Sequence, residues 1–307
     1  MLLFVLPNYE YLANELRENK ALDLGNFKAD RYPNGELNIR VLNSVVNQEC
    51  VILGSIAPPD EQLLIVLLLA HTLKKEGAAK VTALLPYLAY ARANKPKVSL
   101  SLTTEWIGKL FLASGVDEVR AIDIHDGFTE AIFPIPLLSI SAASIFAKKI
   151  KQLKLNNVTL VAPDESGIGR LESIKKLLGT DVPLAHFNKR RTETNIEHTA
   201  FEGSVTETDI VLDDILDTGS TLILACKELQ KAGAKRIIIM VTHGLFTGSK
   251  WEELWEYGVT HIYCTNSVPI SVSDIRIRMM SVVPLFKMEV KNIADDPEVR
   301  SNLDIEN

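Results

Sequence analysis

Three carboxylates and a short run of small hydroxyl residues stand together in the second half of the chain. An apolar run ends at Asp213 and Asp214, and the residues that lead into the next helical pattern are Asp217, Thr218, Gly219, Ser220 and Thr221. Backbone N–H groups and hydroxyls at a helix N-terminus bind phosphate. The two carboxylates would repel a phosphate, so they must face hydrogen-bond donors, and ribose hydroxyls are such donors. This segment predicts a binding loop for a phosphorylated sugar.

The alternative interpretation of the segment is an ordinary capping loop with Asp217 or Thr218 as the N-cap residue. Capping requires one side-chain acceptor, and this segment carries three acidic residues. The sugar-phosphate interpretation is therefore preferred.

Short apolar runs alternate with longer helical patterns along most of the chain, which predicts an α/β fold. Continuously apolar strands are typical of parallel sheets covered on both faces, joined by right-handed crossovers. The predicted strands are Val51–Leu53, Val81–Leu85, Val119–Ile122, Val158–Val161, Ile210–Leu212, Ile237–Val241 and His261–Cys264. The predicted helices are Asp60–Lys75, Thr103–Ala113, Ala142–Gln152, Ile168–Leu178 and Ser220–Ala232.

A faint internal repeat indicates two related domains. Gly77 and Gly233 each follow a helical pattern and precede a strand, and Gly115 and Gly258 do the same later in each half. Glycine is a common residue after a helix end, so it is the repeated order that suggests duplication. The expected division is an N-terminal domain of residues 1–140, a C-terminal domain of residues 141–285 and a tail of residues 286–307 that packs back on the first domain.

Length and composition exclude several classes of protein. The 307 residues carry a net charge of −6, and an acidic balance argues against a nucleic-acid partner. The longest unbroken apolar run, Leu63–Ala70, is too short to span a membrane. Met1–Leu6 is expected to be a core strand and not a signal peptide. Cys50, Cys226 and Cys264 are widely spaced and are expected to be buried thiols in a cytoplasmic protein.

Several ordered segments resemble the ribose-phosphate pyrophosphokinases, or PRPP synthetases. The acidic loop resembles the PRPP-binding loop that this family shares with type I phosphoribosyltransferases. The other matching segments are Asp30–Glu36, Leu85–Arg92, Ile122–His125, Ala162–Asp164, Lys189–Arg191 with Asn195, Thr242–Gly248 and Thr265–Ser267. Their collinear order over residues 1 to about 285 is far more specific than any single match.

The resemblance implies two phosphoribosyltransferase-like domains and a pyrophosphoryl transfer. The C1 hydroxyl of ribose 5-phosphate would attack the β-phosphorus of Mg-ATP to give PRPP and AMP, a reaction used in nucleotide biosynthesis. Lys189 and Arg191 would stabilise charge on the transferring group. These two residues are two apart, so an extended segment would present them on the same side. Taken alone, the basic triplet would be a solvated surface cluster.

The resemblance also implies an ATP site and a metal. Arg92 would contact the ATP phosphates, Tyr32 would stack near the adenine, and Asn34 and Glu36 would bind it by hydrogen bonds. In the family this last element reaches in from a neighbouring subunit, which implies a homo-oligomer such as a dimer or hexamer. The Mg²⁺ ligands would be His125 and Asp164, although Mg²⁺ prefers oxygen, and His125 could instead act through water or be a structural residue at a strand end.

The nucleotide-binding half departs from the family pattern more than the sugar-binding half. Asn34 stands where the family usually has aspartate, Ala93 replaces a glutamine, and Asp126 follows His125 where a small residue is typical. A divergent synthetase is therefore expected, with its nucleotide preference, its oligomer size and its control by phosphate and ADP left open. Two alternatives remain, namely a regulatory paralogue with weak catalysis and, less favoured, a phosphoribosyltransferase that consumes PRPP.

Overall fold

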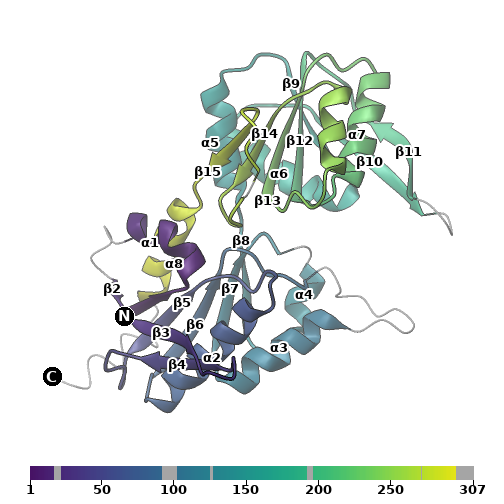
Figure 1. Ribbon diagram of the computed structural model, residues 1–307. Coiled ribbons are helices and arrows are strands. Elements are labelled where there is room, and N and C mark those ends of the chain that lie inside the picture. Colours follow the sequence, from purple (N-terminus) through teal and green to yellow (C-terminus); the bar gives the residue numbers. More distant parts are fainter. Residues whose placement is uncertain (17–21, 92–101, 125–126, 192–195, 271, 295–307) are drawn as a thin grey trace. The chain divides into compact units, whose positions relative to one another are not determined.

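Two mainly parallel sheets organise the chain, one in each of two units. The computed structural model describes residues 1–16, 22–91, 102–124, 127–191, 196–270 and 272–294 (Figure 1). Unit 1 holds residues 1–140 together with the C-terminal segment that begins at Val282, and unit 2 holds Ser141–Ser281.

The sheet of unit 1 has six strands, all parallel, in the order β2-β1-β5-β6-β7-β8. The strands are β1 (Leu2–Val5), β2 (Asp23–Leu24), β5 (Glu49–Leu53), β6 (Lys80–Leu85), β7 (Glu118–Ile122) and β8 (Leu137–Ile140). The helices are η1 (Pro7–Tyr9), α1 (Glu10–Leu16), α2 (Glu61–Lys75), α3 (Thr103–Ser114), α4 (Gly127–Ile132) and α8 (Val283–Ala294). Helices α2 and α3 pack together, and so do α1 and α8. The central strands are continuously buried because helices cover the sheet.

The last helix, α8, joins unit 1 through a buried ion pair. Nη1 of Arg120, on β7, lies 2.7 Å from Oε2 of Glu289, on α8, and the same guanidinium contacts Glu118. All three side chains are about nine-tenths buried. Each buried charge is therefore paired, as burial in a low-dielectric interior requires.

A separate antiparallel hairpin belongs to unit 1. Strands β3 (Phe27–Arg31) and β4 (Leu37–Val41) pair from Phe27↔Val41 to Arg31↔Leu37. This hairpin packs on α2 through β4, and Arg31 lies 2.6 Å from Glu61 at the start of that helix. The hairpin is held to the unit by its contacts with α2, since two strands alone are marginally stable in water.

The sheet of unit 2 has seven strands in the order β11-β10-β9-β12-β13-β14-β15, with only the β10–β11 pair antiparallel. The strands are β9 (Val158–Ala162), β10 (Leu184–Arg191), β11 (Ile196–Glu202), β12 (Thr208–Leu216), β13 (Ile237–Gly244), β14 (Val259–Thr265) and β15 (Ile277–Met280). The helices are α5 (Ala143–Leu153), η2 (Glu165–Gly167), α6 (Ile168–Leu178), α7 (Ser220–Lys231) and η3 (Lys250–Tyr257). Helix α5 packs on α6, and α7 packs on η3.

The α/β fold predicted from the apolar runs is confirmed. Each predicted strand and helix lies within or closely overlaps an observed one, and Met1–Leu6 contains β1. All three cysteines are buried and unpaired, and burial raises the pKa of the Cys50 thiol to about 11. Among the described residues, no helix combines the length and apolar character needed to cross a bilayer.

Candidate active site

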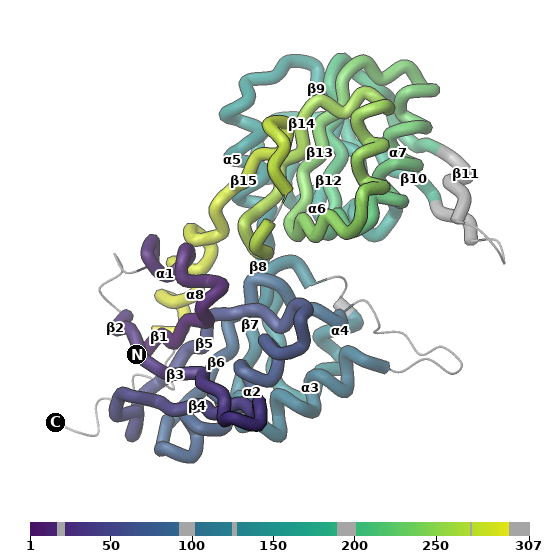
Figure 2. The backbone as a smooth tube through the Cα atoms, viewed as in Figure 1, coloured from purple at the N-terminus to yellow at the C-terminus, as the bar shows by residue number. Residues whose placement is uncertain are grey.

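The predicted sugar-phosphate residues lie where the strand connections of unit 2 change direction. The chain leaves β9 through α6 to reach β10 on one side, and leaves β12 through α7 to reach β13 on the other. Neighbouring parallel strands whose connections diverge leave a crevice beyond their carboxyl ends. Figure 2 shows β9 and β12 side by side, and they pair from Thr208↔Val158 to Val211↔Val161. Asp164 follows β9, and the acidic loop continues from β12. The topology therefore brings both segments to the edge of the unit 2 sheet where these parallel strands end.

Asp213 and Asp214 form a close pair near the carboxyl end of β12. The backbone N–H of Asp214 donates to Oδ1 of Asp213 at 2.9 Å. The side chains are 18% and 10% exposed, so water solvates neither fully. Burial, with a contribution from the charge of Asp214, raises the pKa of Asp213 well above its usual range. The pair therefore suits neutral donors such as sugar hydroxyls, and it would repel a phosphate.

Arg170 on α6 approaches this acidic pair and was not among the residues predicted from the sequence. Its Nη1 lies 3.9 Å from Oδ1 of Asp213, and its Nη2 lies 3.8 Å from Oδ1 of Asp214. This positive charge partly offsets the rise in the pKa of Asp213. Arg170 thus favours the ionised form of the pair that accepts hydrogen bonds.

The residues Asp217–Thr221, called here the phosphate loop, lead from β12 into the first turn of α7. Gly219 occupies the N-cap position with a φ of +84°, and no side chain caps the helix there. The alternative of Asp217 or Thr218 as N-cap is therefore wrong. The hydroxyls of the exposed Thr218 and Ser220 lie 3.2 Å apart. Because the first N–H groups of a helix have no intrahelical acceptor, the loop presents backbone and hydroxyl donors suited to a phosphate.

Glycine is required at position 219 for two reasons. The backbone is left-handed, and a Cβ atom would lie 2.9 Å from the Cα of Trp251. We expect Gly219→Ala to lower the free energy of unfolding by about 1–2 kcal/mol from the backbone conformation alone, with a further loss from this clash. Chemical denaturation would measure the loss.

The matched control for this prediction is Gly258→Ala. Gly258 has a similar φ of +81°, but nothing lies within 4 Å of the added Cβ. The control should show the backbone cost only, so an equal loss of stability in the two variants would contradict close packing at Gly219.

Asp164 begins η2 as its N-cap residue. Its Oδ1 accepts a hydrogen bond from the backbone N–H of Ser166 at 3.0 Å and another from the Ser166 hydroxyl. A carboxylate suits Mg²⁺, which usually takes only one or two protein ligands and keeps water or substrate phosphates in the other positions. Asp164 therefore fits such an ion by its chemistry. His125, the other predicted metal ligand, lies outside the described residues.

The corresponding switch point of unit 1, between β1 and β5, has a different character. Leu6 and Ile56, which follow these strands, are fully buried. A Cβ on Gly54 would lie 2.8 Å from the Leu6 side chain. This crevice is filled by apolar side chains, so among the described residues the switch point of unit 2 carries the acidic loop and that of unit 1 does not.

The predicted adenine-binding residues lie at the tip of the β3–β4 hairpin. Gly35 N donates to Tyr32 O at 2.8 Å, and Glu36 N donates to Oδ1 of Asn34 at 3.2 Å. The Asn34 side chain thus stabilises the turn itself, in the manner of an Asx turn. Tyr32 is 52% exposed, and a Cβ on Gly35 would meet no atom within 4 Å. The tip is therefore open to a ligand or to another chain.

Arg92 also lies outside the described residues. Arg92 and His125 follow β6 and β7, which are neighbouring parallel strands. Just before Arg92, the Tyr90 hydroxyl donates to Asp60, and this bond is the main cause that raises the pKa of Tyr90 to about 12.

Lys189 and Arg191 end strand β10. Their backbones pair with His198 and Ile196 of β11, after a register shift between Asn188 and Lys189. The predicted extended backbone is therefore present, while the two side chains lie outside what the structure describes.

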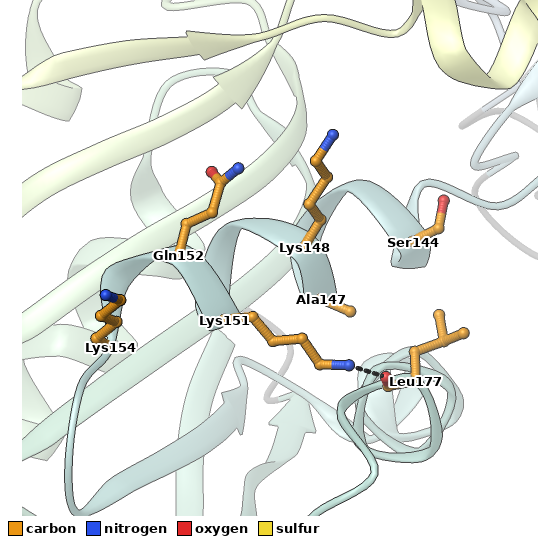
Figure 3. Close-up of a pocket in the computed structure, with 7 residues that line it drawn as sticks. All are labelled: Ser144, Ala147, Lys148, Lys151, Gln152, Lys154 and Leu177. Carbon is orange, nitrogen blue, oxygen red and sulfur yellow. Dashed lines mark hydrogen bonds between the residues drawn. The ribbon is translucent and has the colours of Figure 1, made fainter.

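A surface pocket on unit 2 contains none of the predicted site residues. It lies along α5 beside the end of α6, and Figure 3 shows Nζ of Lys151 donating to the carbonyl of Leu177 at 2.9 Å. Lysines near a helix C-terminus offset the partial negative charge there. Lys151 therefore has a structural explanation at this pocket. Its full lining is Ser144, Ala147, Lys148, Lys151, Gln152, Lys154 and Leu177.

Comparisons with known proteins agree with this architecture. The N-terminal domain of ribose phosphate pyrophosphokinase matches residues 1–115, and the phosphoribosyl transferase domain matches residues 129–274. A ribose-phosphate pyrophosphokinase of Campylobacter jejuni is 28% identical over 96% of this chain and 96% of its own length. That of Prochlorococcus marinus subsp. pastoris is 30% identical over 94% of this chain and 89% of its own length.

A solved structure shows the same fold. The phosphoribosylpyrophosphate synthetase from Mycobacterium smegmatis superimposes with a TM-score of 0.84 at 26% identity, covering 95% of this chain and 98% of that one. The relatives span the whole two-unit chain and not one unit alone. On its sequence, its paired α/β units and its acidic switch-point loop, the chain belongs to the ribose-phosphate pyrophosphokinase family.

Proposed function

We propose that this enzyme transfers the diphosphoryl group of ATP to the C1 hydroxyl of ribose 5-phosphate. The C1 oxygen attacks the β-phosphorus, the bond from that phosphorus to the oxygen bridging it to the α-phosphorus breaks, and AMP departs. The hydroxyl proton is released, and the products are PRPP and AMP. Such a transfer depends on positioning and charge neutralisation more than on covalent help from the protein.

The sugar-phosphate half of the proposal rests on one observation. At the switch point of unit 2, groups that suit a bound anion lie close to carboxylates that suit hydroxyl donors. The uncapped first turn of α7 and the hydroxyls of Thr218 and Ser220 suit the 5-phosphate. The carboxylates of Asp213 and Asp214 lie near the end of β12, the strand that leads into this loop, and they suit the ribose hydroxyls. A ligand with an anion at one end and neighbouring hydroxyls at the other satisfies both groups.

The remaining assignments rest on family resemblance together with the strand order. Tyr32, Asn34, Glu36 and Arg92 would bind ATP, with the exposed hairpin tip supplied by a neighbouring copy in a homo-oligomer. Lys189 and Arg191 would neutralise charge on the group in transfer. When bound, Mg²⁺ would neutralise the ATP phosphates, with Asp164, and His125 directly or through water, holding it. The three buried thiols support a cytoplasmic location.

The test is to incubate the protein with ribose 5-phosphate, Mg²⁺ and ATP and to measure AMP and PRPP. We expect one AMP for each PRPP. No turnover with any nucleoside triphosphate would support the regulatory paralogue and overturn the proposal. Release of pyrophosphate from PRPP and a base, without AMP, would instead indicate a phosphoribosyltransferase. Repeating the assay over several triphosphates, with and without added phosphate or ADP, would establish nucleotide preference and regulation.

A further inference from the structure

We infer that the segment Leu245–Trp251, called here the buttress, sets the position of the phosphate loop and thereby the affinity for the phosphorylated sugar. This inference rests on the proposed function, because it assigns the 5-phosphate to that loop. The buttress follows β13 and continues into η3, so it is a different stretch of chain from the loop it supports. Trp251, the last residue of the buttress, makes its contact with Gly219.

The backbone of the buttress is bonded to the backbone that enters the phosphate loop. The N–H groups of Leu245 and Phe246 donate to the carbonyl of Leu216 at 2.8 Å and 3.1 Å. The N–H of Thr247 donates to the carbonyl of Asp217 at 3.1 Å. Three consecutive donors of the buttress therefore fix the main chain just before Thr218.

The middle of the phosphate loop, at Gly219, lies directly against Trp251. A Cβ on Gly219 would lie 2.9 Å from the Cα of Trp251 and 3.0 Å from its Cβ. Gly219 is the N-cap of α7, so this contact sets where the first turn of that helix begins. A shift of the Trp251 backbone would move the N–H groups that bind the phosphate.

Trp251 is held in turn by two contacts within the buttress. Its Nε1 donates to the carbonyl of Gly248 at 3.0 Å, which closes the turn between Thr247 and η3. Its ring meets the Phe246 ring edge-on, with centroids 5.0 Å apart. Trp251 and Phe246 are only 4% and 6% exposed, and they belong to the core that also holds Leu216 and Ile223. The buttress is therefore a packed support, and the indole N–H is its specific polar link.

The variant Trp251→Phe removes this link while it keeps an aromatic ring against Phe246. We expect the KM for ribose 5-phosphate to rise about three- to tenfold, since a buried hydrogen bond contributes on this scale. We expect kcat and the KM for ATP to stay within about twofold, because the change affects binding of the sugar phosphate equally before and during transfer. Calorimetric titration with ribose 5-phosphate should show the same loss of affinity without turnover.

The matched control is Trp255→Phe. Trp255 lies in the same η3 element, 6.3 Å from Trp251 between ring centroids, and it stacks on the Arg276 guanidinium at 3.9 Å. Neither of these contacts involves the phosphate loop. The control should leave the affinity for ribose 5-phosphate unchanged, and its thermal midpoint shows what loss of an indole costs in stability alone.

Three outcomes would overturn the inference: an unchanged sugar affinity in Trp251→Phe, an equal loss in Trp255→Phe, or an equal rise in the KM for ATP. If Trp251→Phe does not fold, Gly248→Ala tests the same turn. Gly248 has a φ of +69° and open space around it, so alanine strains the turn without a clash. It should weaken sugar binding in the same direction, and unchanged binding would overturn the inference. Failure of the wild-type chain to form PRPP would count against the proposed function instead, because the titration measures binding alone.

Discussion

Replacement of Lys189 by alanine is expected to lower kcat by about 10²–10³ or more, as for the loss of a charge partner used in the transition state. The residue lies at the end of β10, in the basic triplet that resembles the family's catalytic segment. The fold should be retained, because β10 is already held by β9 and β11 along the rest of its length. Steady-state assays of AMP formation at saturating substrates would measure kcat, and circular dichroism would check folding.

Arg190 provides the matched control for this prediction. It carries the same charge in the same strand, and side chains alternate between the two faces of a strand, so Arg190 is not expected to share the face of Lys189 and Arg191. Arg190→Ala should therefore reduce kcat far less than Lys189→Ala. A change confined to KM in the Lys189 variant would mean that the segment only binds substrate.

The sequence predicts the buried part of the fold well because burial on both sides of a parallel sheet demands uninterrupted apolar runs. Strands β9, β12 and β13 follow from such runs, and the helices between them follow from spacing and glycine at their ends. The β10–β11 pair does not follow in this way. Its residues, including Asn188 and Lys189, are largely polar, and an antiparallel pair at a sheet edge lacks the apolar signal.

The acidic loop could be predicted because its residues are neighbours in sequence. Its partners could not, since they come from other elements. Arg170 reaches Asp213 only because β9 lies beside β12, and Trp251 reaches Gly219 only because η3 packs on α7. The same limit explains the incorrect alternative of a side-chain cap. Asp217 and Thr218 are both possible acceptors in the sequence, but the N-cap residue is Gly219, which lies against the Trp251 backbone.

The second large effect is expected from Asp213→Asn and Asp214→Asn, which should mainly weaken binding of ribose 5-phosphate. Hydrogen bonds to charged groups contribute about 1.5–3 kcal/mol, so each change should raise the KM for the sugar phosphate about 10- to 100-fold. The loss in kcat should be smaller. Calorimetric titration and initial rates at varied ribose 5-phosphate would measure the effect, and unchanged sugar affinity would contradict the assignment of these carboxylates.

Asp209→Asn is the matched control for these variants, since Asp209 stands near the opposite end of the same strand. It too is a buried carboxyl, and burial raises its pKa to about 6. The control should leave sugar affinity unchanged, because the ligand would bind beyond the carboxyl end of β12.

The pH dependence of binding separates the roles of these buried carboxyls. Because burial raises the pKa of Asp213, this carboxyl takes up a proton at a higher pH than an ordinary aspartate as the solution is acidified. Protonation would remove the charge that strengthens hydrogen bonds to the sugar hydroxyls, so affinity should fall as the pH is lowered through that raised pKa. Asp213→Asn should remove this part of the pH dependence and Asp209→Asn should keep it, because Asp213, unlike Asp209, would accept hydrogen bonds from the ligand in its ionised form. A pH profile that Asp209→Asn flattens and Asp213→Asn does not would place the sugar hydroxyls elsewhere.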